Sequence, residues 1–251
     1  MQTGPTGERH LALHEGDSTS HVVTRLPLAA LGVSASQFGR AVQASRQFVH
    51  PHVVPIEHFG DEDDTGWLVS PFMGDRHGVV TLGSLLRDKG GFLSPVEARH
   101  AVVQLLEAVQ QAHAFGACHG SLLLDEIMVD RSGSVFIEHY GLRRMLGVAE
   151  ASGSLDADQM EVQSVVAIGY QLVTGLVPET PLIAASRVVP GLDPTWDDWV
   201  ETGLLSPRAG GPGFKSAAHA LTAIAPAGRS ANVRRGTVSV RMALKSLLVG
   251  V

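Results

Sequence analysis

The chain has 251 residues, of which 44% are hydrophobic and 18% are charged, so it can bury a sizeable core. This composition excludes an intrinsically disordered protein, and the formal net charge of −6 argues against nucleic acid as a partner. The single cysteine, Cys118, excludes an internal disulfide. One cysteine fits a reducing compartment, so we expect a cytoplasmic location.

Neither a signal peptide nor a transmembrane segment is expected. Glu8, Arg9 and His10 come before any apolar run, which is not the pattern of a secretory leader. The longest apolar stretch, residues 162–178, contains two glutamines. It is also shorter than the roughly 20 residues that cross a bilayer. We interpret it as a helix buried inside a domain.

The N-terminal part alternates β patterns with one helix. Ser34 or Ser36 is expected to cap that helix, and the His50-Pro51 step ends it. The acidic run 60–66 is expected to be a solvated turn between the last two strands. The predicted elements are strands at 10–15, 21–27, 53–59 and 66–72, and the helix at 34–48.

From Thr81 onward the pattern becomes mostly helical. Ser94, Pro95 and Glu97 form a capping signature that starts a long helix reaching Gly116. Val96, Val103, Leu106 and Val109 are expected to form its buried face. The later predictions are a strand pair at 127–130 and 134–139, a buried helix at 161–176, and helices at 193–205 and 214–225.

The last 26 residues, 226–251, differ in charge from the rest of the chain. They carry five basic residues and no acidic residue. Such a tail is expected either to lie on an acidic surface, its own or a partner's, or to be a terminal helix with a solvated basic face.

Five segments taken together resemble protein kinases. FVHPHVVPIEHF resembles the passage after the kinase αC helix, and TLGSLLRDKGGFLSPVEA resembles the αD-to-αE passage of bacterial eukaryotic-like Ser/Thr kinases. HGSLLLDEIMVD and FIEHYGL stand where the catalytic loop and the DFG motif belong, and EVQSVVAIGYQLVTGLVP resembles αF. The resemblance implies an α+β, two-lobed fold. Its expected parts are an N-lobe at 1–73, a mostly helical C-lobe at 74–225 and the tail at 226–251.

The resemblance also implies that the residues of phosphoryl transfer are replaced. The positions of the lysine that binds the triphosphate and its glutamate partner fall on Arg25 and Ala41. The catalytic aspartate, the magnesium-binding asparagine and the DFG aspartate become Ser121, Glu126 and His139. A serine without an adjacent base accepts no proton, and an imidazole is a poor ligand for magnesium. The glycine-rich loop is expected to be missing or reduced to GPTGER.

The kinase resemblance also implies positions for two histidines and for the residues that line the cleft. The resemblance brings His119 and His139 near each other, either as core imidazoles or as a pH-sensitive contact. The resemblance also implies that Val23, Ser70 and Phe72 line a residual cleft. No metal site and no cofactor are expected, and weak, metal-independent nucleotide binding stays open. Cys118 is expected to be a small buried residue.

The sequence therefore predicts a pseudokinase, a catalytically inactive kinase-like domain that binds a protein as a scaffold or allosteric regulator. Two alternatives remain at this point. One is a nucleotide sensor that uses Arg25 and Ser70. The other is an atypical phosphotransferase in which Asp125 or Glu126 acts as base or metal ligand.

Overall fold

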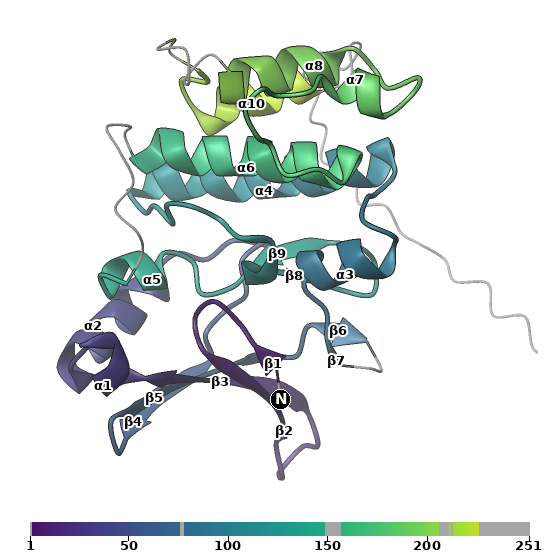
Figure 1. Cartoon of the computed structure of the whole chain (residues 1–251). Coiled ribbons are helices and arrows are strands. Elements are labelled where there is room, and N and C mark those ends of the chain that lie inside the picture. Colours follow the sequence, from purple (N-terminus) through teal and green to yellow (C-terminus); the bar gives the residue numbers. More distant parts are fainter. Residues whose placement is uncertain (1, 76–77, 149–156, 206–210, 212, 226–251) are drawn as a thin grey trace, which may run out of the picture.

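The computed structural model describes residues 2–75, 78–148, 157–205, 211 and 213–225. A twisted sheet with two helices forms the N-terminal lobe, and helices with a small strand pair form the C-terminal lobe (Figure 1). This arrangement confirms the predicted two-lobed α+β class. The tail at 226–251 lies outside the described residues.

The N-lobe sheet has five antiparallel strands in the order β1-β2-β3-β5-β4. The elements of this lobe are β1 Gln2–Thr3, β2 Glu8–Leu13, β3 Ser20–Pro27, α1 Leu28–Leu31, α2 Ala35–Ser45, β4 His58–Glu62 and β5 Thr65–Pro71. Ser34, one of the two predicted caps, closes a capping box at the start of α2.

One predicted strand is displaced. The apolar run at 53–59 was predicted to be a strand, but β4 begins only at His58. Val53, Val54 and Ile56 are buried in the preceding loop, and Val53 pairs with Ile137 of the C-lobe. Their apolar side chains therefore join the lobes instead of filling a sheet face, which periodicity alone does not reveal.

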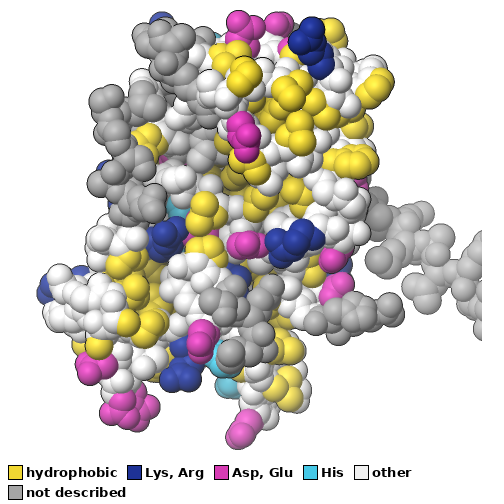
Figure 2. Space-filling view, in the orientation of Figure 1, with side chains coloured by type: hydrophobic (Ala, Val, Ile, Leu, Met, Phe, Trp, Pro, Cys, Tyr) yellow, Lys and Arg dark blue, Asp and Glu magenta, His cyan; other side chains and the backbone are white. Residues whose placement is uncertain are grey.

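The buried face of the N-lobe sheet packs against α2. Leu26 and Leu68 from the strands meet Phe38 and Val42 from the helix in one apolar cluster. At the far end of the sheet, residues 61–64 of the acidic turn are exposed, and Figure 2 shows acidic side chains there. The prediction of a solvated turn is confirmed.

The C-lobe is built around a layer formed by α4 and α6, which lie side by side (Figure 1). Helices α8 and α10 cover the side of this layer remote from the N-lobe. The elements are β6 Gly74–Asp75, β7 Gly78–Val79, α3 Leu82–Asp88, α4 Pro95–Phe115, η1 Leu124–Glu126, β8 Ile127–Val129, β9 Val135–Ile137, α5 Leu142–Met145, α6 Ala157–Thr174, α7 Ala185–Val188, α8 Thr195–Val200, η2 Glu201–Leu205 and α10 Ala217–Ile224.

The residues predicted to pack do so, with one exception. Leu122, Ile127, Val129 and Ile137 are all buried. Val96 was assigned to the buried face of α4, yet it is 79% exposed because its place in the first turn faces solvent. Among the described residues, no helix has the length and apolarity needed to cross a membrane.

We predict that Ser94→Ala lowers the free energy of unfolding by about 1 kcal/mol, because the Ser94 hydroxyl accepts a hydrogen bond from the Glu97 amide at the start of α4. Ser94→Asp is the matched control, since it keeps an N-cap acceptor. Urea unfolding measures both variants. An alanine variant as stable as the parent contradicts the assigned cap.

Candidate functional site

The strand register defines which side chains face the cleft between the lobes. Arg9 of β2 lies opposite Thr24 of β3, and Thr24 lies opposite Leu68 of β5. Residues directly opposite each other point to the same face of a sheet. All three are buried on one face, which packs against α2 at Leu68 and reaches Glu138 of the C-lobe at Arg9.

Arg25 is exposed and lies on the other face, so the prediction that it occupies the lysine position in the cleft is wrong. Val23 shares the face of Arg25 and is likewise not a cleft residue. A shift of one residue moves every side chain to the opposite face, and sequence matching alone did not fix that register.

The cleft holds a buried ion pair between the lobes. Arg9 Nε lies 3.1 Å from both carboxylate oxygens of Glu138, and Arg9 Nη2 lies 2.5 Å from Glu138 Oε2. Arg9 Nη2 also donates to the Asp125 carbonyl at 2.7 Å. The two side chains are only 2% and 4% exposed. Bidentate pairing of this kind fixes geometry as well as charge.

The short glycine turn between β1 and β2 closes over this arginine. The Gly4 amide donates to the Gly7 carbonyl at 2.8 Å. A Cβ atom on Gly4 would lie 2.4 Å from Arg9 Cζ, so the absent side chain makes room for the guanidinium. The first strand is present but only two residues long. The predicted reduced loop thus holds an internal cation.

The other predicted cleft residues have mixed positions. Ser70 is on the cleft face opposite Val22 and is 3% exposed, and its hydroxyl lacks a hydrogen-bond partner among the described residues. Phe72 is half-buried just beyond the end of β5. Ala41 is buried in α2 and offers only a methyl group where an ion-pair partner was sought.

The two replaced positions of the catalytic loop, Ser121 and Glu126, offer no free carboxylate. Ser121 is exposed. Glu126 is 1% exposed; its Oε1 accepts from Arg143 Nη1 at 2.9 Å and its Oε2 from the Leu123 amide at 3.1 Å. Both of its oxygens are thus engaged within the protein.

His119 and His139 are buried in the same region. Nδ1 of His119 and both ring nitrogens of His139 have no hydrogen-bond partner among the described residues. Burial lowers the pKa of each imidazole, so both are neutral near pH 7. His139 also adopts a left-handed backbone, with φ of 48°. The expected proximity is supported by their mutual electrostatic influence.

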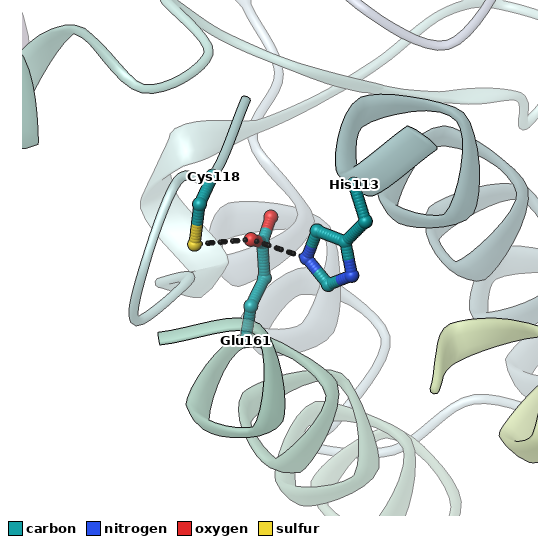
Figure 3. A group of neighbouring side chains, drawn as sticks. All are labelled: His113, Cys118 and Glu161. Atoms are coloured by element: carbon teal, nitrogen blue, oxygen red, sulfur yellow. Dashed lines mark hydrogen bonds and ion pairs between the residues drawn. The ribbon is translucent and has the colours of Figure 1, made fainter. Parts of the chain in front are cut away.

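Glu161, at the start of the buried helix α6, accepts hydrogen bonds from four donors, and Figure 3 shows two of them, His113 and Cys118. Its Oε2 accepts at 3.0 Å from His113 Nε2, from Cys118 Sγ and from the His119 amide. Tyr140 Oη donates to its Oε1. Burial acts to raise the pKa of Glu161, but the hydrogen bonds from His113, Tyr140 and Cys118 outweigh it and lower the pKa.

Sequence reasoning missed this cluster. Cys118 was interpreted as a small buried residue, but it is half-buried, and it donates to Glu161. Burial and the neighbouring Glu161 carboxylate raise the pKa of the Cys118 thiol. The signal was weak because Glu161 lies 43 residues further along the chain.

The described fold is a protein-kinase fold. The kinase domain of Mycobacterium tuberculosis PknI superposes with a TM-score of 0.68 at 16% identity, covering 89% of this chain and 91% of that domain. The C-lobe and the sheet-based N-lobe therefore have the arrangement implied by the sequence resemblance. No model of a known protein family matches the chain.

The curated relatives are serine/threonine kinases. The chain is 22% identical over 160 residues to serine/threonine-protein kinase PrkC of Bacillus subtilis, covering 57% of this chain and 24% of PrkC. It is 25% identical over 239 residues to probable serine/threonine-protein kinase PknB of Bifidobacterium longum, covering 77% of this chain and 34% of that protein. The chain thus spans a quarter to a third of these relatives.

We predict that Arg9→Met destabilises the protein by about 3–5 kcal/mol, because it leaves the Glu138 carboxylate buried without its cation. The double variant Arg9→Met with Glu138→Met should recover most of this loss, since both charges are then removed. Urea unfolding of the single and double variants measures the coupling.

Arg87→Met is the control, because Arg87 is 67% exposed and lies 4.0 Å from Asp125. Its effect should stay within about 0.5 kcal/mol. A double variant no more stable than Arg9→Met alone contradicts the assigned ion pair.

We also predict that stability falls below about pH 6.5. His119 and His139 have pKa values lowered by burial, so the unfolded chain binds protons there that the folded chain does not. Each contributes a loss of about 1.4 kcal/mol per pH unit until its folded-state pKa is reached. His139→Asn, which suits a left-handed backbone, should reduce that slope in urea unfolding followed across pH. An unchanged slope contradicts the assignment.

Proposed function

We propose that this chain is a pseudokinase, a kinase-like domain that acts by binding a protein partner instead of transferring phosphate. The observation that carries the proposal is the Arg9–Glu138 pair, which places a buried ion pair of the chain's own charges between the lobes. A nucleotide entering there has to displace a desolvated, bidentate ion pair.

The charges at Glu138, His139 and Glu126 also support the pseudokinase proposal. Phosphoryl transfer depends on cations that neutralise the triphosphate and on carboxylates that hold magnesium. Glu138 adds negative charge between the lobes, and Arg9, the cation bonded to it among the described residues, is already paired and cannot neutralise a triphosphate as well. His139 offers an imidazole, which magnesium disfavours as a ligand, and both carboxylate oxygens of Glu126 already accept hydrogen bonds, so neither position suits magnesium.

A surface away from the cleft is suited to a partner. A groove of about 500 Å³ lies between α3, α4 and the β8–β9 hairpin, and apolar side chains such as Leu85, Val96 and Val135 line it. Grooves of this size and lining commonly receive apolar groups of another molecule. The basic tail at 226–251 is proposed to meet an acidic surface, on this chain or on the partner.

A nucleotide sensor is the second candidate. It is favoured by the Ser70 hydroxyl, which is buried on the cleft face without a hydrogen-bond partner among the described residues. A buried polar atom left unpaired is costly, and a bound ligand would satisfy it. In this case the nucleotide binds without metal.

Thermal-shift measurements with ATP, alone and with Mg²⁺ or Mn²⁺, test the proposal together with an assay for transfer of labelled phosphate. A ligand at 100 times its Kd adds about 2.7 kcal/mol of stability, which is readily detected. We expect no metal-dependent shift and no incorporated phosphate. Ser70→Phe, which blocks the cleft, is the matched control for any metal-independent shift.

Two outcomes decide against the proposal. Phosphate incorporation that disappears in Glu126→Gln shows an active enzyme. A saturable, metal-independent ATP shift that disappears in Ser70→Phe favours the nucleotide sensor instead.

A further inference from the structure

A group of mixed metal-type donors lies on the side of the catalytic loop remote from the cleft. His113 comes from the last turn of α4, Cys118 from the following loop and Glu161 from the first turns of α6 (Figure 3). Their donor atoms, an imidazole nitrogen, a sulfur and a carboxylate oxygen, all lie within 4.8 Å of one another. The three residues thus converge on one point from three segments.

The spacing of these atoms is close to that of a four-coordinate metal centre. His113 Nε2 and Cys118 Sγ each lie 3.0 Å from Glu161 Oε2. Ligands around a tetrahedral zinc ion, with bonds of about 2.0–2.3 Å, lie about 3.3–3.8 Å apart. Each of these two distances would therefore have to lengthen by about 0.3–0.8 Å to admit the ion.

The carboxylate is held in place by further hydrogen bonds. The His119 amide donates to Glu161 Oε2, and Tyr140 Oη donates to Oε1. Outer contacts of this kind orient metal ligands and are part of a built site. Asp158 Oδ1 lies 3.6 Å from His113 Nε2 and is exposed, so it or a water can supply a fourth ligand.

We propose that His113, Cys118 and Glu161 form a zinc site that ties α4, the catalytic loop and α6 together. Sulfur and imidazole ligands favour zinc over magnesium, which prefers oxygen ligands in octahedral geometry. Sequence spacing does not predict a metal site here, because Cys118 and Glu161 are 43 residues apart. The proposal does not rest on the pseudokinase assignment.

Binding has a simple proton balance. Without metal, the Cys118 thiol donates a hydrogen bond to Glu161. When zinc binds, the thiol loses this proton and Sγ binds the metal as a thiolate. The His113 imidazole passes its proton from Nε2 to Nδ1, so it binds metal in the neutral form. One proton therefore leaves the protein for each zinc bound, and affinity rises with pH.

The test uses the full chain, stripped of metal with a chelator. Zinc is titrated in competition with a chromogenic chelator, and Co²⁺ is used as a spectroscopic probe. We expect one equivalent of zinc, a thiolate-to-cobalt charge-transfer band, and no response to Mg²⁺. Cys118→Ser should abolish that band and weaken zinc binding by more than about tenfold.

Cys118→Ser keeps a hydrogen-bond donor to Glu161, so it should leave the fold intact. Thermal unfolding without metal checks this. His113→Gln should also weaken zinc binding, whereas His14→Gln, a change at an exposed histidine of the β2–β3 turn, should not. Cobalt bound without a charge-transfer band, or equal zinc affinity in the parent and Cys118→Ser, overturns the proposal.

Discussion

The buried pair of Arg9 and Glu138 is the interaction on which the interlobe arrangement depends. Arg9 belongs to a strand of the N-lobe, and Glu138 follows the last strand of the C-lobe hairpin. Neither charge tolerates burial alone, so each requires the other to be in place. The short glycine turn and the Asp125 carbonyl complete the surroundings of the guanidinium. The turn between β1 and β2 thus covers the Arg9 guanidinium, a group of the chain itself.

Glu161 has a similar role inside the C-lobe. It lies at the start of α6 and receives hydrogen bonds from the end of α4, from the catalytic loop and from Tyr140. A fully buried carboxylate is stable only when several donors compensate its lost hydration. The loop that begins at Cys118 is thereby held against α6. The residues that hold the loop in place are therefore different from the residues that would contact phosphate.

The sequence predicted the elements of the fold well, because helix caps and apolar periodicity are local signals. Ser34, Ser94 and the apolar positions of the β8–β9 hairpin act as expected. The site was predicted less well. The replacements at Ser121 and His139 follow from order along the chain. The face of the sheet on which Arg25 lies depends on strand register. The role of Arg9 depends on Glu138, which is 129 residues away in the sequence. Neither is a local property.

The errors at Arg25 and Arg9 have one physical cause. A comparison with active kinases places each charged residue where it would contact the triphosphate or magnesium. In this protein the cation is supplied by β2 and not by β3, and its anion precedes His139 instead of replacing it. The two charges are therefore paired with each other between the lobes. Pairing these charges fixes the position of β2 over the C-lobe hairpin, because neither charge is stable there alone.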